Sequence, residues 1–304
     1  MAFIVLVTGV YAAEGLLIVS WIRGRVAVEE AGGVLWHPAA MTVHVLAILG
    51  VGCMAWGYFV EPYWLENSRV ELTSEKLNKT SLRIVHLSDL HCDPRPRNEP
   101  KLGERINSLK PDIIVFTGDA VNSREAVPLF RRTMQGLEAK LGKFAVRGNI
   151  DIGRPRDWDL FEGTGFDLLD AEAVTVEKDG ETVQICGLNP LQGPGHAPPG
   201  EGSADAFTVF LHHYPSGIDG VAGTEVDLYL CGHTHGGQVA LPLYGAIITL
   251  SRTGKKYERG HYRVESTDMY VSRGIGMEGG AAPRVRFWSR PEVVVIDVRP
   301  ASVQ

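Results

Sequence analysis

Residues 232–238 read Gly232-His233-Thr234-His235-Gly236-Gly237-Gln238, which places two histidines one residue apart in a glycine-rich segment. Residues separated by one position point to the same face of an extended chain, so both imidazoles can meet at one metal site. The glycines allow a tight backbone and a close approach to bound groups. Residues 227–231, which are apolar after Asp227, come directly before and are typical of a buried strand. We therefore expect a metal-binding loop at the end of a strand.

Four other short polar segments also follow predicted strands. They are Asp89-Leu90-His91, Gly118-Asp119-Ala120-Val121-Asn122, Gly148-Asn149-Ile150-Asp151 and His212-His213-Tyr214-Pro215. Loops at the carboxyl ends of strands are where open α/β sheets bind ligands. The five segments together supply carboxylates, a carboxamide and imidazoles. This set suits zinc, iron or manganese, and the lack of thiolates argues against a structural zinc site.

The charge of such a site predicts its ligand. Two divalent ions carry four positive charges, and the carboxylates of Asp89 and Asp119 return only two of them. Asp119 has two oxygens and can bridge both ions. The remaining positive charge would attract a phosphate, hold its oxygens and acidify a water between the ions.

The hydrophobic pattern predicts an α/β fold around these loops. In the first half we expect strands at residues 82–87, 113–116 and 143–147, with helices at 98–109 and 124–141, the second ended by Gly142. Strands that alternate with helices favour a parallel sheet covered by helices. In the second half we expect a hairpin with its turn at Asp179-Gly180, followed by strands at residues 207–211, 227–231, 246–250, 269–271 and 293–298.

Two further stretches are predicted to connect the regular elements. Residues 61–79 are polar and predict a connector, whereas residues 189–202 are dense in Pro and Gly and predict a loop. That loop is long enough to be a substrate-facing flap, and a simple surface insertion is the alternative. His86 is expected to be a core histidine, and Cys92 a small buried apolar residue.

The N-terminal region is predicted to be a membrane anchor, residues 1–66, ahead of a catalytic domain, residues 67–304. Residues 2–22 are nearly all apolar, and residues 34–60 carry no formal charge. Each stretch is long enough for a helix that crosses a bilayer. A cleavable signal peptide and a buried helical hairpin are the alternatives. The first lacks a basic start and a clear cleavage site, and the second usually has shorter apolar runs.

The basic residues near these stretches bear on membrane orientation. Arg23 and Arg25 lie in the short loop between the two apolar stretches, and the positive-inside tendency would keep that loop in the cytoplasm. The catalytic domain would then face outside the plasma or inner membrane of a bacterium. Glu14 lies within the first apolar stretch, either as a functional group or as a charge tolerated near a helix end.

Overall composition narrows the possible partners. The 304 residues carry a formal net charge of −6 and have no basic clusters, so we expect no nucleic-acid partner. The four cysteines have no CxxC spacing, which argues against both a disulfide framework and a thiolate zinc site.

With these motifs in order, residues 82–298 resemble the calcineurin-like metallophosphoesterases, whose motifs are D-x-H, G-D-x-x-D/N, G-N-x-D/E, H and G-H-x-H. Residues 232–238, with the later Ser272-Arg273-Gly274-Ile275-Gly276 and Arg290-Pro291-Glu292, resemble the bacterial membrane-associated branch. Some members of that branch and its neighbours hydrolyse UDP-diacylglucosamine. The resemblance implies a four-layer α/β/β/α sandwich, here preceded by the two predicted transmembrane helices.

The resemblance also implies a ligand set for two divalent ions of manganese, iron or zinc. One ion would be held by Asp89, His91, Asp119 and His235, and the other by Asp119, Asn149, His213 and His233. His213 is preferred over His212 because the family writes His-x-Pro and His213 has that spacing to Pro215. Asp119 and Asn149 would then act in catalysis as well as in binding.

One position departs from the family pattern. Many members have a histidine after the motif asparagine, where it is thought to act as an acid or to orient the phosphate, and this chain has Ile150. A leaving group that needs little protonation, such as a phosphate or an aryl oxide, is therefore expected. His212 and Arg147 are the nearby substitutes in sequence, and each is otherwise a packing or surface residue.

The sequence thus predicts a membrane-bound enzyme that hydrolyses a phosphodiester or a pyrophosphate with a dimetal-activated water. A lipid-linked substrate fits the anchor, although the anchor would equally localise an enzyme for soluble nucleotides. The alternative from another class is a membrane-bound pseudoenzyme that binds metal or phosphate ligands without turnover. A nuclease is a third option, which the acidic composition disfavours.

Overall fold

The computed structural model of the protein describes residues 2–22, 37–155, 158–192, 203–279 and 283–301. The chain divides into two compact units, Met1–Val60 and Glu61–Gln304. The predicted boundary after residue 66 lies just inside the second unit. Arg23 and Arg25, and residues 193–202 of the predicted Pro- and Gly-rich loop, lie outside the described residues.

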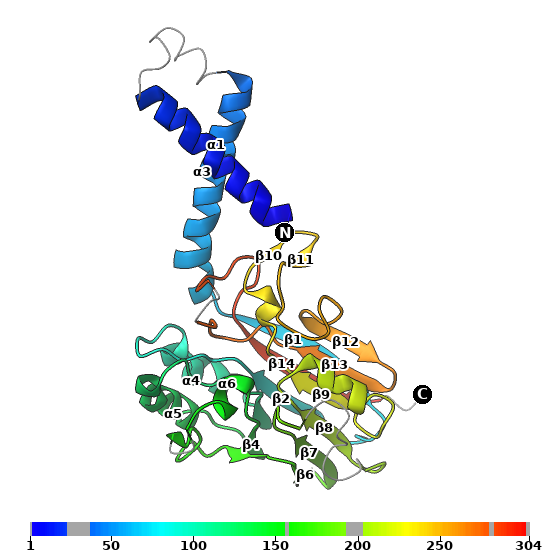
Figure 1. The fold of residues 1–304 in the computed structure, drawn as a ribbon. Coiled ribbons are helices and arrows are strands. Elements are labelled where there is room, and N and C mark those ends of the chain that lie inside the picture. Colours follow the sequence, from blue (N-terminus) through cyan, green and yellow to red (C-terminus); the bar gives the residue numbers. More distant parts are fainter. Residues whose placement is uncertain (1, 23–36, 156–157, 193–202, 280–282, 302–304) are drawn as a thin grey trace. The chain divides into compact units, whose positions relative to one another are not determined.

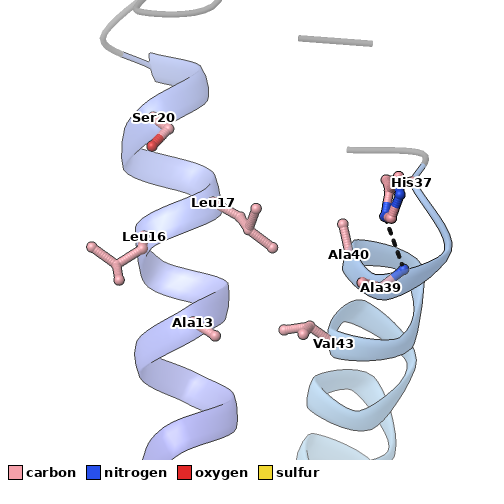
Figure 2. A pocket seen from close by; sticks show the side chains of 8 residues that line it. All are labelled: Ala13, Leu16, Leu17, Ser20, His37, Ala39, Ala40 and Val43. Carbon is pink, nitrogen blue, oxygen red and sulfur yellow. Dashed lines mark hydrogen bonds between the residues drawn. The ribbon is translucent and has the colours of Figure 1, made fainter. Parts of the chain in front are cut away.

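The first unit is a pair of helices, α1 (Ala2–Ile22) and α3 (Pro38–Phe59), which occupy the two apolar stretches. The Tyr11 hydroxyl donates a hydrogen bond to the carbonyl of Ala47 at 3.2 Å, and His44 Nδ1 lies 2.7 Å from a Glu14 carboxylate oxygen. The contact with His44 gives Glu14 a polar partner on the other helix. An open groove of about 530 Å³ lies between the helices. The side chains that line it are Ala13, Leu16, Leu17, Ser20, His37, Ala39, Ala40 and Val43 (Figure 2).

The two helices differ in the length of their apolar stretch. Within the described residues, one helix, Pro38–Tyr63, is long and apolar enough to cross a bilayer. The apolar part of α1, Val7–Ile22, is shorter. The two predicted helices are therefore present, while the crossing of a membrane by either helix stays a prediction.

The second unit contains two six-stranded sheets (Figure 1). The first sheet has the order β1 (Glu66–Ser74), β14 (Glu292–Pro300), β2 (Leu82–Leu87), β3 (Ile113–Phe116), β4 (Gly142–Ala145) and β5 (Asp167–Leu168). The second has the order β12 (Gly260–Val264), β13 (Thr267–Val271), β9 (Leu228–Cys231), β8 (Phe207–Leu211), β7 (Glu181–Gly187) and β6 (Glu172–Lys178). Neighbours from β2 to β5 and from β7 to β13 run parallel, and β14 is antiparallel to β2.

Helices cover one face of the first sheet. Those of the second unit are α4 (Glu99–Asn107), α5 (Val127–Gln135) and the short α6 (Asn149–Ile152). The amphipathic α4 buries Leu102 and Ile106 in one core with Val85 and Phe116 of the sheet. This confirms the predicted parallel sheet with helices on its surface.

The other face of the first sheet packs against the second sheet. One buried cluster joins Ile84 and Val115 of the first sheet to Val209 and Leu230 of the second. Beyond the second sheet, a further cluster joins Phe210 to Ile218 in a 3₁₀ turn, Pro215–Gly220. The expected fourth layer of α-helix is thus replaced, in the described part of the chain, by 3₁₀ turns and loops. The Gly and Pro residues of residues 214–223 explain this, because they disfavour a regular helix.

Three predictions of local structure were wrong. Residues 61–79 are not a plain connector, because β1 lies there and pairs with β14 along its whole length. It is an edge strand with partial, alternating burial, so its sequence appears polar. The helix predicted to Leu141 ends at Gln135, since the chain must return for Leu141 to bond the Asp112 carbonyl at 2.8 Å. The strand predicted over residues 246–250 is reduced to the small hairpin of β10 (Ala240–Leu241) and β11 (Gly245–Ala246).

Candidate metal centre

The five predicted loops meet because the strands before them end in register. Leu87 at the end of β2 pairs with Phe116 of β3, and Phe116 pairs with Ala145 of β4. In the second sheet, Leu211 of β8 pairs with Leu230 of β9. The loops that follow these strands therefore emerge at neighbouring positions, as the carboxyl ends of parallel strands do.

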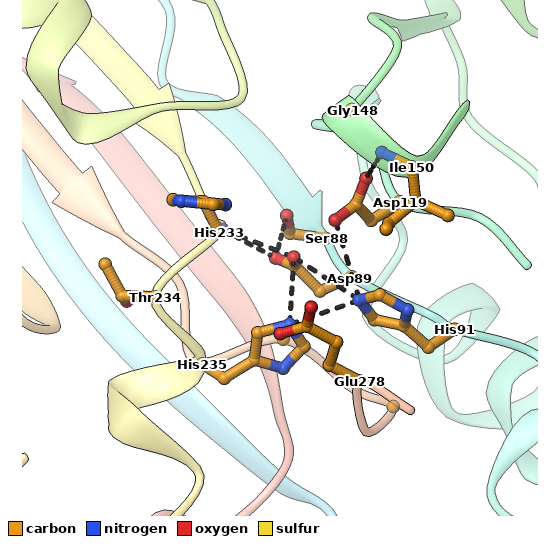
Figure 3. A network of polar contacts seen from close by, with 12 residues as sticks. Ser88, Asp89, His91, Asp119, Gly148, Ile150, His233, Thr234, His235 and Glu278 are labelled. Atoms are coloured by element: carbon orange, nitrogen blue, oxygen red, sulfur yellow. Dashed lines mark hydrogen bonds and ion pairs between the residues drawn. The ribbon is translucent and has the colours of Figure 1, made fainter. Parts of the chain in front are cut away.

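Asp89, His91 and His235 form a first cluster of buried ligand-type side chains, whose ligand atoms all lie within 4.8 Å of one another. Nε2 of His235 lies 3.3 Å from Oδ1 of Asp89 and 3.1 Å from Nε2 of His91. Figure 3 shows these three side chains pointing toward one another. Two imidazoles and a carboxylate with this spacing form a suitable partial shell for one divalent ion.

Asp119, His213 and His233 form a second cluster that meets the same 4.8 Å limit. Oδ2 of Asp119 lies 3.2 Å from Nε2 of His213 and 3.6 Å from Nε2 of His91, a member of the first cluster. One carboxylate thus faces both clusters. This is the position expected of a ligand shared by two ions.

Two buried polar atoms near the second cluster lack a hydrogen bond within the described protein: Oδ1 of Asn149 and Nε2 of His213. The 3.2 Å contact of His213 with Asp119 is an ion-pair distance without hydrogen-bond geometry. A buried polar atom without a partner costs free energy, about 1–3 kcal/mol. A bound cation would satisfy both lone pairs, so the residues fit a metal at this site.

Hydrogen bonds on the far side of two rings favour metal binding through Nε2. Nδ1 of His213 donates to the carbonyl oxygen of Thr117 at 2.7 Å, and Nδ1 of His91 lies 3.0 Å from Oδ1 of Asn122. A proton held on Nδ1 leaves the Nε2 lone pair for a metal, the usual arrangement for ligating histidines. Asn122, from the second motif, thereby orients His91.

Most of the candidate ligands have a strained backbone. The backbone φ angle is positive at Asp89 (50°), His91 (38°), Asp119 (59°), His233 (71°) and His235 (52°). Non-glycine residues rarely adopt this region, and such strain concentrates at functional sites. Gly232 also has a steric role, because a Cβ there would overlap Ser88 Oγ and Asp89 Oδ2.

Neighbouring imidazoles favour the ionised form of the Asp119 and Asp89 carboxylates. Burial favours the neutral acid at Asp119, but the neighbouring imidazole of His213 outweighs it and holds the pKa of Asp119 below its ordinary value. Burial is likewise outweighed at Asp89, chiefly by His235, so the pKa of Asp89 is also lowered. An ionised carboxylate is the form that a cation binds.

Asp151, whose role the sequence left unassigned, ties two of the loops together. Its Oδ2 accepts hydrogen bonds from the backbone N–H groups of Asp119 at 2.7 Å and Gly148 at 2.8 Å, and its Oδ1 accepts one from Ala120 at 2.9 Å. Burial and the negative charge of Asp119 raise the pKa of Asp151 to about 6. The carboxylate therefore positions the Asp119 loop without facing the clusters itself.

Arg286 was missed by the sequence analysis. Its guanidinium is fully buried and donates to the carbonyl oxygens of His235 at 3.0 Å, Gly276 at 3.0 Å and Arg273 at 2.7 Å. Its Nη2 also lies 3.2 Å from Nδ1 of His235, so it fixes the orientation of that ring. No motif marks this position, and only the tertiary structure brings it to the site.

Glu278 is the second residue that the sequence analysis missed. Figure 3 places its carboxylate beside His235, and its backbone N–H donates to Oε1 of Gln238 at 2.7 Å. Burial raises the pKa of Glu278. Glu278 follows the segment Ser272–Gly276, which the sequence analysis used only as part of the resemblance to the family. No metal-ligand spacing indicated Glu278.

His212 and Arg147, the expected substitutes for the missing histidine, lie elsewhere. The His212 ring stacks on Phe210 and has its Nδ1 3.1 Å from the Tyr229 hydroxyl, on the side of the second sheet away from His213. Arg147 is half-exposed and lies 3.8 Å from Asp170. The structure brings neither to the clusters. For His212 the reason is that it is adjacent to His213, and adjacent residues on an extended chain point to opposite faces.

Comparison with known proteins identifies the family. The family model described as calcineurin-like phosphoesterase matches residues 82–237. The uncharacterized metallophosphoesterase YkuE of Bacillus subtilis is 32% identical, over 83% of this chain and 92% of its own. The chain belongs to the calcineurin-like phosphoesterases. The predicted family is confirmed.

Two further relatives of this phosphoesterase have names that state an activity. Phosphodiesterase YaeI of Escherichia coli is 27% identical over 79% of this chain and 91% of its own. The UDP-2,3-diacylglucosamine pyrophosphatase LpxG of Chlamydia muridarum is 25% identical over 84% of this chain and 96% of its own. The phosphoesterase family makes hydrolysis of a phosphoester the expected reaction class.

Proposed function

We propose that the protein is a dimetal phosphodiesterase or pyrophosphatase. One ion is held by Asp89, His91, Asp119 and His235, and the second by Asp119, Asn149, His213 and His233. The observation that carries this proposal is the position of Asp119 between two clusters, with its Oδ2 3.2 Å from Nε2 of His213 and 3.6 Å from Nε2 of His91. The buried Oδ1 of Asn149, which has no hydrogen bond within the described protein, supports it. When bound, two divalent ions would supply positive charge for the phosphoryl oxygens and would lower the pKa of a water between them.

Other residues of the protein fix the orientation of the proposed ligands. Asp151 fixes the backbone of the Asp119 loop, and Arg286 fixes the ring of His235. The surrounding groups are therefore oriented before a substrate arrives, which is what electrostatic stabilisation of a transition state requires. The side chain after Asn149 is apolar and supplies no proton to a leaving group.

The proposed substrate class follows from the missing general acid at Ile150 and from the activities that the relatives' names state. Without an acid at Ile150, the favoured bonds are those whose leaving group is a phosphate or an aryl oxide. The names of YaeI and LpxG support a diester or a pyrophosphate. A lipid-linked pyrophosphate joins this chemistry to an anchor that includes α3, with the catalytic unit on the outer side of a bacterial membrane.

The proposal is tested with the full chain in detergent, stripped of metal and reloaded with manganese. We expect bound metal near two ions per chain, turnover of bis-p-nitrophenyl phosphate, and slower turnover of the monoester p-nitrophenyl phosphate. Chelation should abolish the activity. Two bound ions without turnover of either substrate would contradict the enzyme and favour the pseudoenzyme for which Ile150 is the one argument.

Restoring a histidine at Ile150 should add the missing acid. The Ile150 N–H donates to Oδ1 of Asp119 at 2.8 Å, so a side chain at this position starts beside the clusters (Figure 3). We expect Ile150→His to raise turnover of an alkyl diester, glycerophosphocholine, by about 100-fold, the usual contribution of general acid catalysis. Turnover of bis-p-nitrophenyl phosphate should change little, because its leaving group needs little protonation.

The control is Ile152→His, which places the same side chain on the same short helix two residues further along. It should alter neither rate. Equal gains for both diesters with Ile150→His would show that the effect is not protonation of the leaving group.

A further inference from the structure

The segment after the double-histidine motif has an unusual surface. Five large apolar side chains on it and on a neighbouring loop are more than half exposed: Leu243 (111%), Leu250 (68%), Ile248 (58%), Tyr244 (57%) and Trp288 (55%). We call these five residues the apolar face. Soluble surfaces rarely group large apolar side chains in this way, and such patches mark sites of interaction.

Hydrogen bonds join the two segments that carry the apolar face. The backbone N–H of Ala240 in the β10–β11 hairpin donates to the carbonyl of Phe287 at 2.8 Å, directly before Trp288. Arg259 donates to the carbonyl of Trp288 at 2.6 Å. Leu243 and Tyr244 form the loop between β10 and β11, so they project from a segment that is anchored at its base.

The charge around the apolar face is positive in a chain that is acidic overall. Residues 239–257 contain Arg252, Lys255 and Lys256, all exposed, and no Asp or Glu. Nζ of Lys255 lies 4.1 Å from the centre of the Tyr244 ring. The nearest carboxylate in sequence, Glu258, accepts a hydrogen bond from the Ala246 N–H at 2.8 Å and pairs with Lys255.

We propose that the apolar face docks into the surface of an anionic lipid bilayer. Apolar side chains with Tyr and Trp among them suit the interfacial region, and the surrounding Arg and Lys suit anionic headgroups. The excess of positive charge in this segment is complementary to an anionic membrane surface. This contact belongs to the catalytic unit and is separate from the helices α1 and α3.

The apolar face also adjoins the candidate metal centre. The carbonyl oxygen of Leu250 lies 3.4 Å from Nε2 of His233, a candidate ligand in the second cluster. Docking would therefore hold the mouth of the site against the lipid, where the phosphate of a lipid-linked substrate lies. This consequence rests on the proposed function, whereas the docking itself does not.

The test uses the full chain in vesicles and does not depend on turnover. With exposed Cys53 replaced by Ser, the cysteines left are the buried Cys92, Cys186 and Cys231, so Leu243→Cys can be labelled selectively with the environment-sensitive dye NBD. In vesicles with phosphatidylglycerol we expect the NBD emission to shift to the blue and its quenching by aqueous iodide to fall. The matched control is Thr175→Cys, which is exposed on β6 and should stay quenched.

Two further comparisons make the result specific. Protection of the label should be weaker in pure phosphatidylcholine vesicles, and Lys256→Glu should weaken it further by removing one attraction to the headgroups. Equal iodide quenching at positions 243 and 175 would overturn the proposal. Protection that rises with protein concentration at fixed lipid would also overturn it, because a second copy of the chain would then cover the face.

The labelled variants are also assayed with the water-soluble bis-p-nitrophenyl phosphate. If the unlabelled parent does not turn over this substrate, the result counts against the proposed function alone. The fluorescence reports docking whether or not the protein is active. A protected label at position 243 together with full diester turnover would support both.

Discussion

Replacing Asp119 with Asn should lower turnover of bis-p-nitrophenyl phosphate by about 1,000-fold, the scale on which preorganised charge contributes to catalysis. The change keeps the shape of the side chain and removes the negative charge that faces both clusters. Oδ1 of Asp119 accepts a hydrogen bond from Ile150 at 2.8 Å, while Oδ2 faces His91 and His213. An amide cannot hold two ions as a carboxylate can, so we expect bound metal to fall as well.

The control for this variant is Asp112→Asn. Asp112 is also a buried carboxylate, just before β3, whereas Asp119 follows that strand. It pairs with Lys178 at 2.6 Å and Lys140 at 3.1 Å, far from the metal ligands along the strand. Asp112→Asn should keep diester turnover at 25 °C. Full activity of Asp119→Asn, measured with metal content in the same preparation, would refute the assignment of the site.

Two single variants, each without one histidine of one cluster, should each lose one of the two ions. His91→Ala deletes a ligand of the first cluster, and His233→Ala deletes one of the second. We expect each variant to retain about one ion per chain and to lose diester turnover by roughly 1,000-fold, because a second ion clamps the oxygens of the displaced phosphate. Metal analysis after dialysis gives the stoichiometry, and the diester assay gives the rate.

The control for the histidine variants is His261→Ala. His261 is an exposed residue of β12 that pairs with Asp268 at 2.7 Å, in the part of the second sheet that carries no candidate ligand. It should retain two ions and full turnover. Two ions in His91→Ala or His233→Ala would contradict the division of the ligands into two sites.

The sequence was informative wherever a residue type and its spacing reflect local chemistry. The Gly232–Gln238 segment and the four loops that match it mark the ends of buried strands, and apolar runs such as residues 82–87 and 113–116 announce those strands directly. A ligand must be an imidazole, a carboxylate or an amide whatever the fold, so the candidates could be named before the fold was known.

The sequence failed where the partner of a residue is distant in the chain. β1 appears polar because it is an edge strand, and only its pairing with β14 reveals it. His212 and His213 are adjacent in sequence just after β8, yet the His212 ring stacks on Phe210 whereas His213 donates a hydrogen bond to the Thr117 carbonyl. Arg286 and Glu278 carry no motif, and only the tertiary structure brings their side chains beside His235.

The sequence by itself determined the family, the reaction class and the set of ligand-type residues, because these depend on side-chain chemistry at short spacings. The tertiary structure alone decided that Asp119 faces both clusters, that Asp151 and Arg286 contact the Asp119 loop and the His235 ring, and that an apolar, basic segment adjoins His233. The physical reason is that these features arise from contacts between strand ends far apart in the chain. Such contacts exist only once the two sheets have packed and their strands are in register.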